Sequence, residues 1–495
     1  MIPISKLAAS RLLLLAFLVF LLAGCGESRD TGEAPPETTS PGQKAPGASS
    51  SPKTNPETTP GTTRETPREA AGSTTAENAE DGTRPERRAE GRGEIRYGYT
   101  YGQASGNLVV EGTGGLPESD PVDVPLDGRP AWVVGVPLGN ATAWVAALAD
   151  GRVQAFRLDG SNEAELVSIS PDRLPPGQPP LVKARGDSLE LVTSRNAEVS
   201  ELTHPVPASP EEEGTWFGVS ADGSVFEEVD EGDFVGIGEL GITAIPDARF
   251  VRGAGGTLAF LSDPTTLYEH DVLGDGVEAG SMTLLRPEEG ATELGVIFPA
   301  SGGVFEQVAP MWFEAPGVEG ELLAITESTE PLATRLSVYS LNGSLVAAGP
   351  YIGEPMKWRH LLAAGPFGPN GETELVNTLT PHLGGTIEFH RPDFANGSLN
   401  IVATQPGYTS HRINSRNLDT ARAGDLDGDG RWEILVPNDA YTELGAIRHE
   451  AGGATVAWTL PADGTIVTNL ASATTPGGRA QIAAGREDGS LRIWP

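Results

Sequence analysis

Cysteine and basic residues are scarce in this 495-residue chain, and both shortages limit what it can do. There is one cysteine, so no intramolecular disulfide, thiolate zinc cluster or iron–sulfur site is possible. Lysine and arginine number 34 against 68 aspartates and glutamates, which gives a net charge of −34. Such a chain repels phosphate backbones and anionic lipid headgroups. We therefore expect neither nucleic-acid binding nor a polybasic membrane contact.

Helical periodicity is also nearly absent, and 63 glycines and 41 prolines disfavour helix interiors. Short strand-like runs recur instead, such as residues 131–136 and 142–148. Between such runs stands a glycine that usually follows Asp or Asn, as at Asp150-Gly151, Asp222-Gly223 and Asp488-Gly489. These dipeptides favour the positive φ of two-residue hairpin turns. The pattern predicts an all-β fold.

The single cysteine ends a typical export signal. Lys6 and Arg11 precede an apolar run over residues 12–22, which is too short to cross a bilayer of ~30 Å as a helix. The run ends in Leu-Ala-Gly-Cys25, which resembles the lipobox of bacterial lipoproteins. The resemblance implies that residues 1–24 are a signal peptide and that Cys25 carries a diacylglyceryl anchor. An uncleaved membrane anchor with a chance cysteine is the alternative.

The next segment lacks the side chains that build a core. Residues 26–94 contain no Ile, Leu, Val, Met, Phe, Tyr or Trp, and the first such residue is Ile95. Without apolar burial, a segment cannot offset about 1–2 kcal/mol of backbone entropy per residue. We therefore expect residues 25–94 to be a disordered tether on the exported face of a bacterial membrane. Gly26 favours the outer membrane or cell surface, because Asp at this position is the usual inner-membrane retention signal of such lipoproteins.

The rest of the chain repeats itself. Residues 365–376 parallel residues 424–436, with Glu374 matching Glu433. Glu321 and Gln481 extend the series, and the successive spacings are 53, 59 and 48 residues. Periods of 40–60 residues in short strands are typical of propeller blades. We predict a β-propeller of seven or eight blades over residues 95–495, closed by an early strand from residues 94–101 or 107–111. Two stacked β-sandwiches are the alternative.

One motif, D-x-D-x-D-G-x-x-E, indicates a metal site. Its fixed positions are Asp425, Asp427, Asp429, Gly430 and Glu433. Alternate carboxylates on a tight loop converge on one point, and Ca²⁺ prefers six to eight oxygens. The carbonyl of Arg431 is the natural backbone ligand. The run resembles the calcium loops of FG-GAP and VCBS propeller repeats, and residues 420–450 carry the resemblance. We expect one calcium ion here. The copy at residues 365–374 lacks the three aspartates, so we expect it to be free of metal.

Other motifs are weak. The seven histidines show no H-E-x-x-H spacing, and no G-x-S-x-G nucleophile motif exists. We assign His382 and His390, eight residues apart in one predicted hairpin, to turn and strand packing rather than to metal binding.

Three functions fit these features. The first is a monomeric, non-catalytic propeller, stabilised by calcium and anchored at Cys25, that binds a protein or a glycan in recognition, adhesion or envelope assembly. The second resembles the quinoprotein-type propellers of envelope-assembly lipoproteins, through residues 149–160. The third is a propeller enzyme that acts on a polysaccharide, ester or phosphate in the central channel.

Overall fold

The computed structural model describes residues 94–495 except 162, 212–213, 231–234 and 288–291. All of them belong to the second of two compact units, residues 86–495. The predicted signal peptide, the predicted lipidation site Cys25 and the predicted tether up to residue 93 lie outside the described residues. Strands dominate, with a single short 3-10 helix, η1 (Leu116–Glu118), among the described residues. In this part of the chain no helix is long and apolar enough to cross a membrane.

The predicted hairpin tips are present, with longer loops than expected. Gly151, Gly223 and Gly489 have φ of 83°, 90° and 80° and lie between consecutive antiparallel strands. The preceding aspartate does not share the positive φ; Asp150, for example, accepts the backbone N–H of Arg152 (3.0 Å). The prediction of two-residue turns was therefore wrong. The aspartate carboxylate closes the turn from a normal backbone conformation, so only glycine needs the left-handed one.

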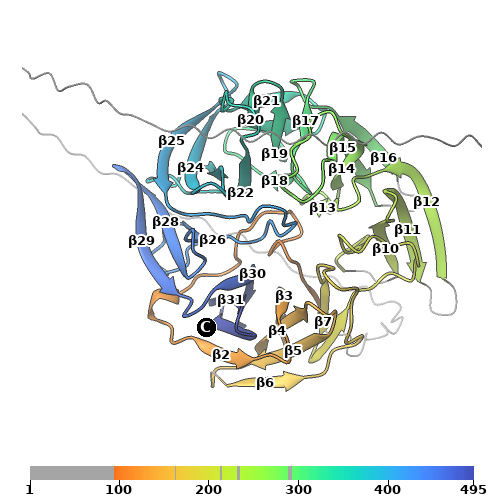
Figure 1. Cartoon of the computed structure of the whole chain (residues 1–495), viewed down its shortest axis with the longest axis vertical. Coiled ribbons are helices and arrows are strands. Elements are labelled where there is room, and N and C mark those ends of the chain that lie inside the picture. Colours follow the sequence, from red (N-terminus) through yellow and green to blue (C-terminus); the bar gives the residue numbers. More distant parts are fainter. Residues whose placement is uncertain (1–93, 162, 212–213, 231–234, 288–291) are drawn as a thin grey trace, which may run out of the picture. The chain divides into compact units, whose positions relative to one another are not determined.

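Consecutive strands pair antiparallel into sheets arranged radially around a common centre (Figure 1). Four sheets have four strands each. They are β3 (Pro130–Leu138), β4 (Ala141–Leu148), β5 (Val153–Leu158) and β6 (Ala164–Val167); β9 (Val206–Pro207), β10 (Thr215–Val219), β11 (Ser224–Asp230) and β12 (Val235–Thr243); β26 (Arg422–Gly424), β27 (Glu433–Pro437), β28 (Glu443–Glu450) and β29 (Gly453–Pro461); and β30 (Ile466–Thr474), β31 (Ala480–Arg486) and β32 (Ser490–Trp494) with β2 (Val122–Pro125).

The other strands form two further sheets. A three-stranded sheet contains β1 (Ile95–Gly98), β7 (Val182–Arg185) and β8 (Ser188–Leu191). A continuous thirteen-stranded sheet contains β13 (Val251–Arg252), β14 (Leu258–Thr265), β15 (Glu278–Arg286), β16 (Thr292–Ile297), β17 (Val304–Phe305), β18 (Met311–Phe313), β19 (Leu322–Thr329), β20 (Ala333–Ser340), β21 (Leu345–Ala348), β22 (Arg359–Gly365), β23 (Glu374–Leu379), β24 (Thr386–Asp393) and β25 (Ser398–Pro406). Within it β13–β16, β18–β21 and β22–β25 are successive antiparallel runs, joined by β17 and by a parallel contact of β21 with β25. The fold is all-β and propeller-like, as predicted.

The core lies between the faces of neighbouring sheets. Trp144 of β4, Ala471 of β30, Ala483 of β31 and Ile493 of β32 share one buried cluster. At about 25 cal/mol per Å² of apolar area, this face-to-face burial is the main stabilising term of the fold. Each sheet therefore depends on its neighbours, and the ring depends on its closure.

An early strand closes the ring, but the predicted residues were wrong. β2 pairs antiparallel with the C-terminal strand β32, placing Val122 opposite Ile493 and Val124 opposite Leu491. The first candidate range, residues 94–101, contains β1, which pairs with β7 instead. The second, residues 107–111, lies in the centre of the ring. Several early segments have strand-like alternation, and only tertiary packing selects the one that closes the sheet.

Residues 99–116, the channel segment, run through the middle of the ring (Figure 1). Backbone hydrogen bonds join this segment to the inner strands β13, β18 and β26, through the pairs Ala104–Arg252, Ser105–Trp312 and Val110–Ala423. Beside Tyr101 and Leu108 a cavity of about 20 Å³ remains. That volume accommodates about one water molecule. The channel segment therefore packs against inner strands of several sheets in the centre of the propeller.

Candidate metal centre

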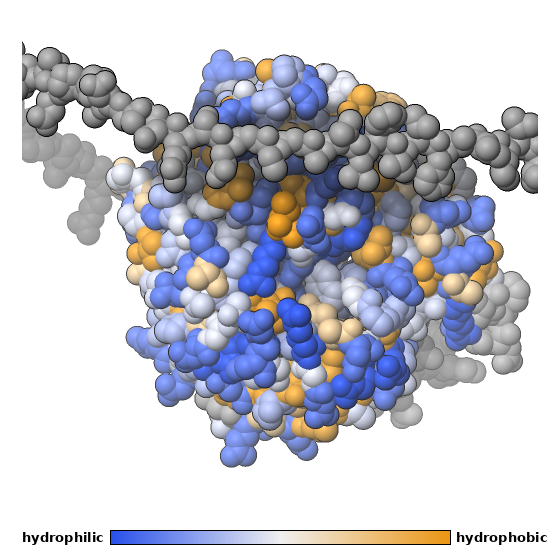
Figure 2. Space-filling view, in the orientation of Figure 1, coloured by the Kyte–Doolittle hydropathy of each residue, from blue (hydrophilic) through white to orange (hydrophobic). Residues whose placement is uncertain are grey.

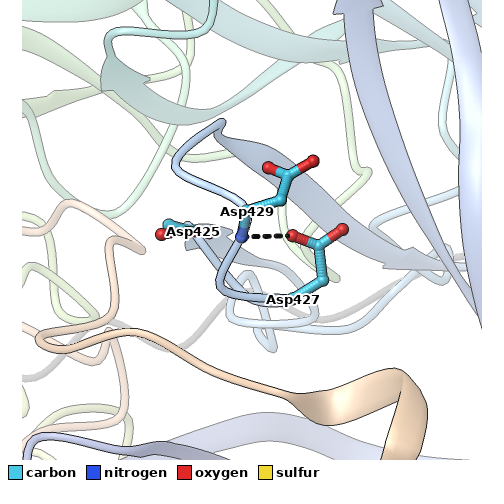
Figure 3. A group of neighbouring side chains, drawn as sticks. All are labelled: Asp425, Asp427 and Asp429. Atoms are coloured by element: carbon cyan, nitrogen blue, oxygen red, sulfur yellow. Dashed lines mark hydrogen bonds between the residues drawn. The ribbon is translucent and has the colours of Figure 1, made fainter.

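The predicted calcium motif forms the connection from β26 to β27, here called the acidic loop (residues 425–433). Asp425, Asp427 and Asp429 each bring a carboxylate oxygen within 4.8 Å of the others (Figure 3). The three side chains come from alternate positions of one tight loop, as the sequence predicted.

Local hydrogen bonds fix this geometry. Asp425 accepts the N–H of Gly428 (2.9 Å), Asp427 accepts the N–H of Asp429 (3.1 Å; Figure 3), and Asp429 accepts the N–H of Arg431 (3.0 Å). Each bond uses the Oδ1 atom, so backbone N–H groups of the loop hold the carboxylates of the same loop in place. Gly428 has φ of 82°, and a Cβ there would lie 2.7 Å from the Gly114 carbonyl, so this position requires glycine.

A cation that the sequence analysis did not identify meets these carboxylates. Arg448, on β28, donates from Nη1 to Asp429 (2.9 Å), from Nη2 to Asp427 (2.8 Å) and from Nε to Glu433 (2.8 Å). Trp458 Nε1 also donates to Asp427 (3.1 Å). Glu433 opens β27 and has no exposed surface. The guanidinium of Arg448 therefore bridges the buried carboxylate of Glu433 to those of Asp427 and Asp429.

Burial dominates the electrostatics of Glu433. It raises the pKa of this carboxyl to about 7, against the hydrogen bonds and charge of Arg448, which lower it. A buried carboxylate remains ionised only beside a compensating charge. The site therefore depends on a cation, whether the guanidinium or a metal ion.

Arg431 contributes its backbone rather than its side chain. Its guanidinium reaches away from the aspartates to Glu450 (2.7 Å), a pair that is more than one-third exposed on both sides. The predicted role of its carbonyl as a metal ligand stays a prediction.

The acidic loop also contacts the channel segment. Gly114 N–H donates to the carbonyl of Asp425 (2.9 Å), and Leu116 N–H donates to the carbonyl of Leu426 (3.1 Å). A Cβ on Gly114 would lie 2.0 Å from the Leu426 carbonyl, so the two backbones approach as closely as glycine allows. The loop is thus joined to the segment that leads to the closing strand β2.

The neighbouring repeat has the same framework without the aspartates. Glu374 lies opposite Gly365 at the start of β23, just as Glu433 lies opposite Gly424. Arg391 of β24 donates to Glu374 from Nη2 (2.7 Å) and Nε (3.0 Å). The Glu–Arg pair across two strands is therefore a shared feature of both repeats. Sequence analysis could have found Arg448 in this way, because both repeats place Arg 15–17 residues after Glu.

The donor set of the acidic loop fits a calcium ion. Three carboxylates, those of Asp427, Asp429 and Glu433, accept hydrogen bonds from one guanidinium, and Asp425 adds a fourth carboxylate beside Asp427 and Asp429. All of these ligand atoms are oxygens, which Ca²⁺ prefers. The guanidinium occupies Oδ2 of Asp427 and of Asp429. Calcium bound there would compete with Arg448.

A second cluster of titratable groups surrounds Trp358. The ring of His360 stacks on this indole at 5.1 Å, and the ring of His411 meets it edge-on at 5.1 Å. Burial lowers the pKa of His411 to about 4 and lowers that of His360 well below its usual value. His390 lies apart from this cluster, beside Glu388 on β24. His360 lies on β22 and His411 in the loop after β25, so sequence spacing gave no signal for the cluster.

Comparison with known proteins gives only distant structural likenesses. No model of a known family and no curated protein matches the chain. Solved structures that resemble it include the WD40 domain of coronin from Toxoplasma gondii, with 10% identity, a TM-score of 0.40, and coverage of 77% of this chain and 87% of that one. BBS1N in complex with ARL6DN has 10% identity, a TM-score of 0.41, and coverage of 77% and 97%. A europium-containing methanol dehydrogenase has 9% identity, a TM-score of 0.47, and coverage of 77% and 89%. None of them carries an argument about function.

Proposed function

We propose that this protein is a non-catalytic propeller that a lipid on Cys25 displays on the bacterial cell envelope, where it binds a protein or a glycan. The observation that carries this proposal is the segment that runs through the centre of the ring. A propeller enzyme of the predicted kind needs space for its substrate in the central channel, and the channel segment takes up part of that space. This supports a binding scaffold over the channel enzyme.

We also propose that the propeller has eight blades. The strand pairings support this number: β3–β6, β9–β12, β13–β16, β18–β21, β22–β25, β26–β29 and β30–β32 with β2 make seven groups, and β1 with β7 and β8 makes the eighth. In this arrangement the closing blade consists of β2 and the last three strands of the chain, β30, β31 and β32.

The partner surface is expected to be polar. Apolar residues on the uncovered part of the face in Figure 2 are interspersed among hydrophilic ones. Together with the net charge of −34, this favours a basic protein or a hydroxyl-rich glycan over an apolar surface.

Three experiments test the proposal. The full chain is used to capture material from envelope extracts, and the captured fraction is assayed for both protein and carbohydrate; specific capture of either supports a binding role. Hydrolysis of ester, glycoside or phosphate substrates by the purified chain would contradict the non-catalytic role. For the anchor, Cys25→Ser is expected to move the protein from the membrane to the soluble fraction, and unchanged fractionation would refute lipidation.

A further inference from the structure

Two histidines line one surface pocket at the junction of two loops. The pocket, of about 450 Å³, is bordered by His382 from the loop after β23 and by His411 from the loop after β25. The hydroxyl of Thr409 donates to the carbonyl of Pro381, which joins the two loops directly beside the histidines. The fold therefore holds the two loops, and with them the two imidazoles, close to each other.

His411 presents a free lone pair. Its Nε2 lies 2.6 Å from the carbonyl oxygen of Ser415, and a carbonyl only accepts, so Nε2 carries the hydrogen. Nδ1 is then an unprotonated acceptor, and it is buried without a hydrogen-bond partner among the described residues. Leaving a buried polar atom unsatisfied costs about 1–3 kcal/mol. Metal-binding histidines typically donate their second nitrogen to a backbone carbonyl in this way.

His382 supplies a second such atom. Its Nδ1 is also buried and has no hydrogen-bond partner in the described part of the chain. The two rings are 6.1 Å apart between centroids and inclined at 75°. With metal–nitrogen distances of about 2.0–2.1 Å and a ring radius of about 1.1 Å, two imidazoles on one ion have centroids about 5–6 Å apart. The observed spacing of the two rings is therefore close to that of two imidazoles on one metal ion.

We propose that His382 and His411 bind a divalent first-row transition-metal ion such as Zn²⁺, with the remaining coordination positions open to water or to a ligand in the pocket. Imidazole ligands suit zinc, copper and nickel, whereas calcium prefers oxygen. Asp439 and Arg412 also line the pocket. The guanidinium of Arg412 is turned aside, 3.7 Å above the Tyr441 ring. This site is independent of the acidic loop, which offers only oxygen donors.

Zn²⁺ binding to the full chain tests the proposal. Isothermal titration with millimolar Ca²⁺ present, so that the acidic loop is occupied by calcium, is expected to show one zinc ion per chain. His382→Ala, at a partly exposed position, and His411→Gln are each expected to weaken binding about 100-fold or more, because loss of an outer partner alone costs 10–100-fold. Zinc-edge X-ray absorption of the unmutated chain is expected to show two imidazole ligands, and this measurement needs no variant to fold.

His204→Gln is the matched control. His204 is buried and its Nε2 lacks a hydrogen-bond partner among the described residues, but its nearest aromatic neighbour is Tyr99 at 6.5 Å rather than a second imidazole. Zinc binding is expected to survive this substitution and Asp427→Ala. The proposal is overturned if no zinc binds, if the absorption spectrum shows fewer than two imidazoles, if folded His382→Ala binds normally, or if Asp427→Ala abolishes binding.

Discussion

Replacing Arg448 by glutamine separates the two cations that could serve the acidic loop. The substitution removes hydrogen bonds to Asp427, Asp429 and Glu433 and leaves their carboxylates facing one another. Removing one partner of a fully buried ion pair costs about 3–5 kcal/mol. Here Glu433 is buried, but the side chains of Asp427 and Asp429 are 18% and 44% exposed, which reduces the cost. We expect Arg448→Gln to lose about 2–3 kcal/mol when calcium is chelated.

Calcium is expected to reverse this loss. At 100 times its Kd, a ligand that binds only the folded state adds about 2.7 kcal/mol. For a fold of this size that gain is about 3–5 °C in Tm. The unmutated chain is expected to gain less, because calcium must first displace the guanidinium. Arg448→Gln is therefore expected to show the larger calcium response and Asp427→Ala none, in thermal melts of the full chain with Ca²⁺ or a chelator.

Arg391→Gln is the matched control for this experiment. It breaks the equivalent pair with Glu374 in the neighbouring repeat, where the three aspartates are missing. It is expected to destabilise the chain to the same degree with and without calcium. If calcium raises the Tm of Arg448→Gln no more than that of Arg391→Gln, calcium does not compete with Arg448, and if calcium raises the Tm of neither variant, the acidic loop does not bind calcium.

Three further predictions concern the rest of the ring. Burial lowers the pKa of His204 in the folded chain to about 4. As the pH falls, this histidine is therefore protonated in the unfolded chain before it is protonated in the folded chain. About 3 kcal/mol of stability is then lost between about pH 6.5 and 4, and His204→Gln should flatten denaturation curves measured across that range. Val124→Asp puts a charge opposite Leu491 in the closing strand, and a Tm lowered by less than about 2 °C would contradict its role in closure. Arg249 and Asp419 form a buried pair (2.8 Å); Arg249→Met should cost about 3–5 kcal/mol, and the double variant with Asp419→Asn should recover part of it in a denaturant-based double-mutant cycle.

The sequence predicted what local chemistry determines. The strand class followed from alternation and from the glycine turns, and the aspartates of the acidic loop converge as their spacing indicated. It did not predict contacts made across long separations. Arg448 reaches the loop only because β27 and β28 pair with Glu433 opposite it, and Val122 meets Ile493 only when the ring closes. Such pairings depend on register and packing, which one sequence encodes only collectively.

The same reason explains why the sequence assigned His382 to packing beside His390 and did not pair it with His411. His382 and His411 are 29 residues apart, in loops whose approach is set by two strands and a hydroxyl-to-carbonyl bond. Motif reading detects ligands on one loop or one helix, where spacing alone implies proximity. It cannot detect ligands that tertiary structure brings together.

The acidic loop has a consequence beyond its own stability, because the channel segment connects it to the closure of the ring. Gly114 and Leu116 donate backbone hydrogen bonds to the loop, and the chain then enters β2, which pairs with the last strand. A cation that makes the loop rigid therefore also stabilises the route by which the N-terminal side of the fold reaches the C-terminal strand. If the protein is held by a lipid on Cys25, any pull on the tether reaches β1 and this same segment first. A cation in the acidic loop is therefore expected to oppose opening of the ring from that end.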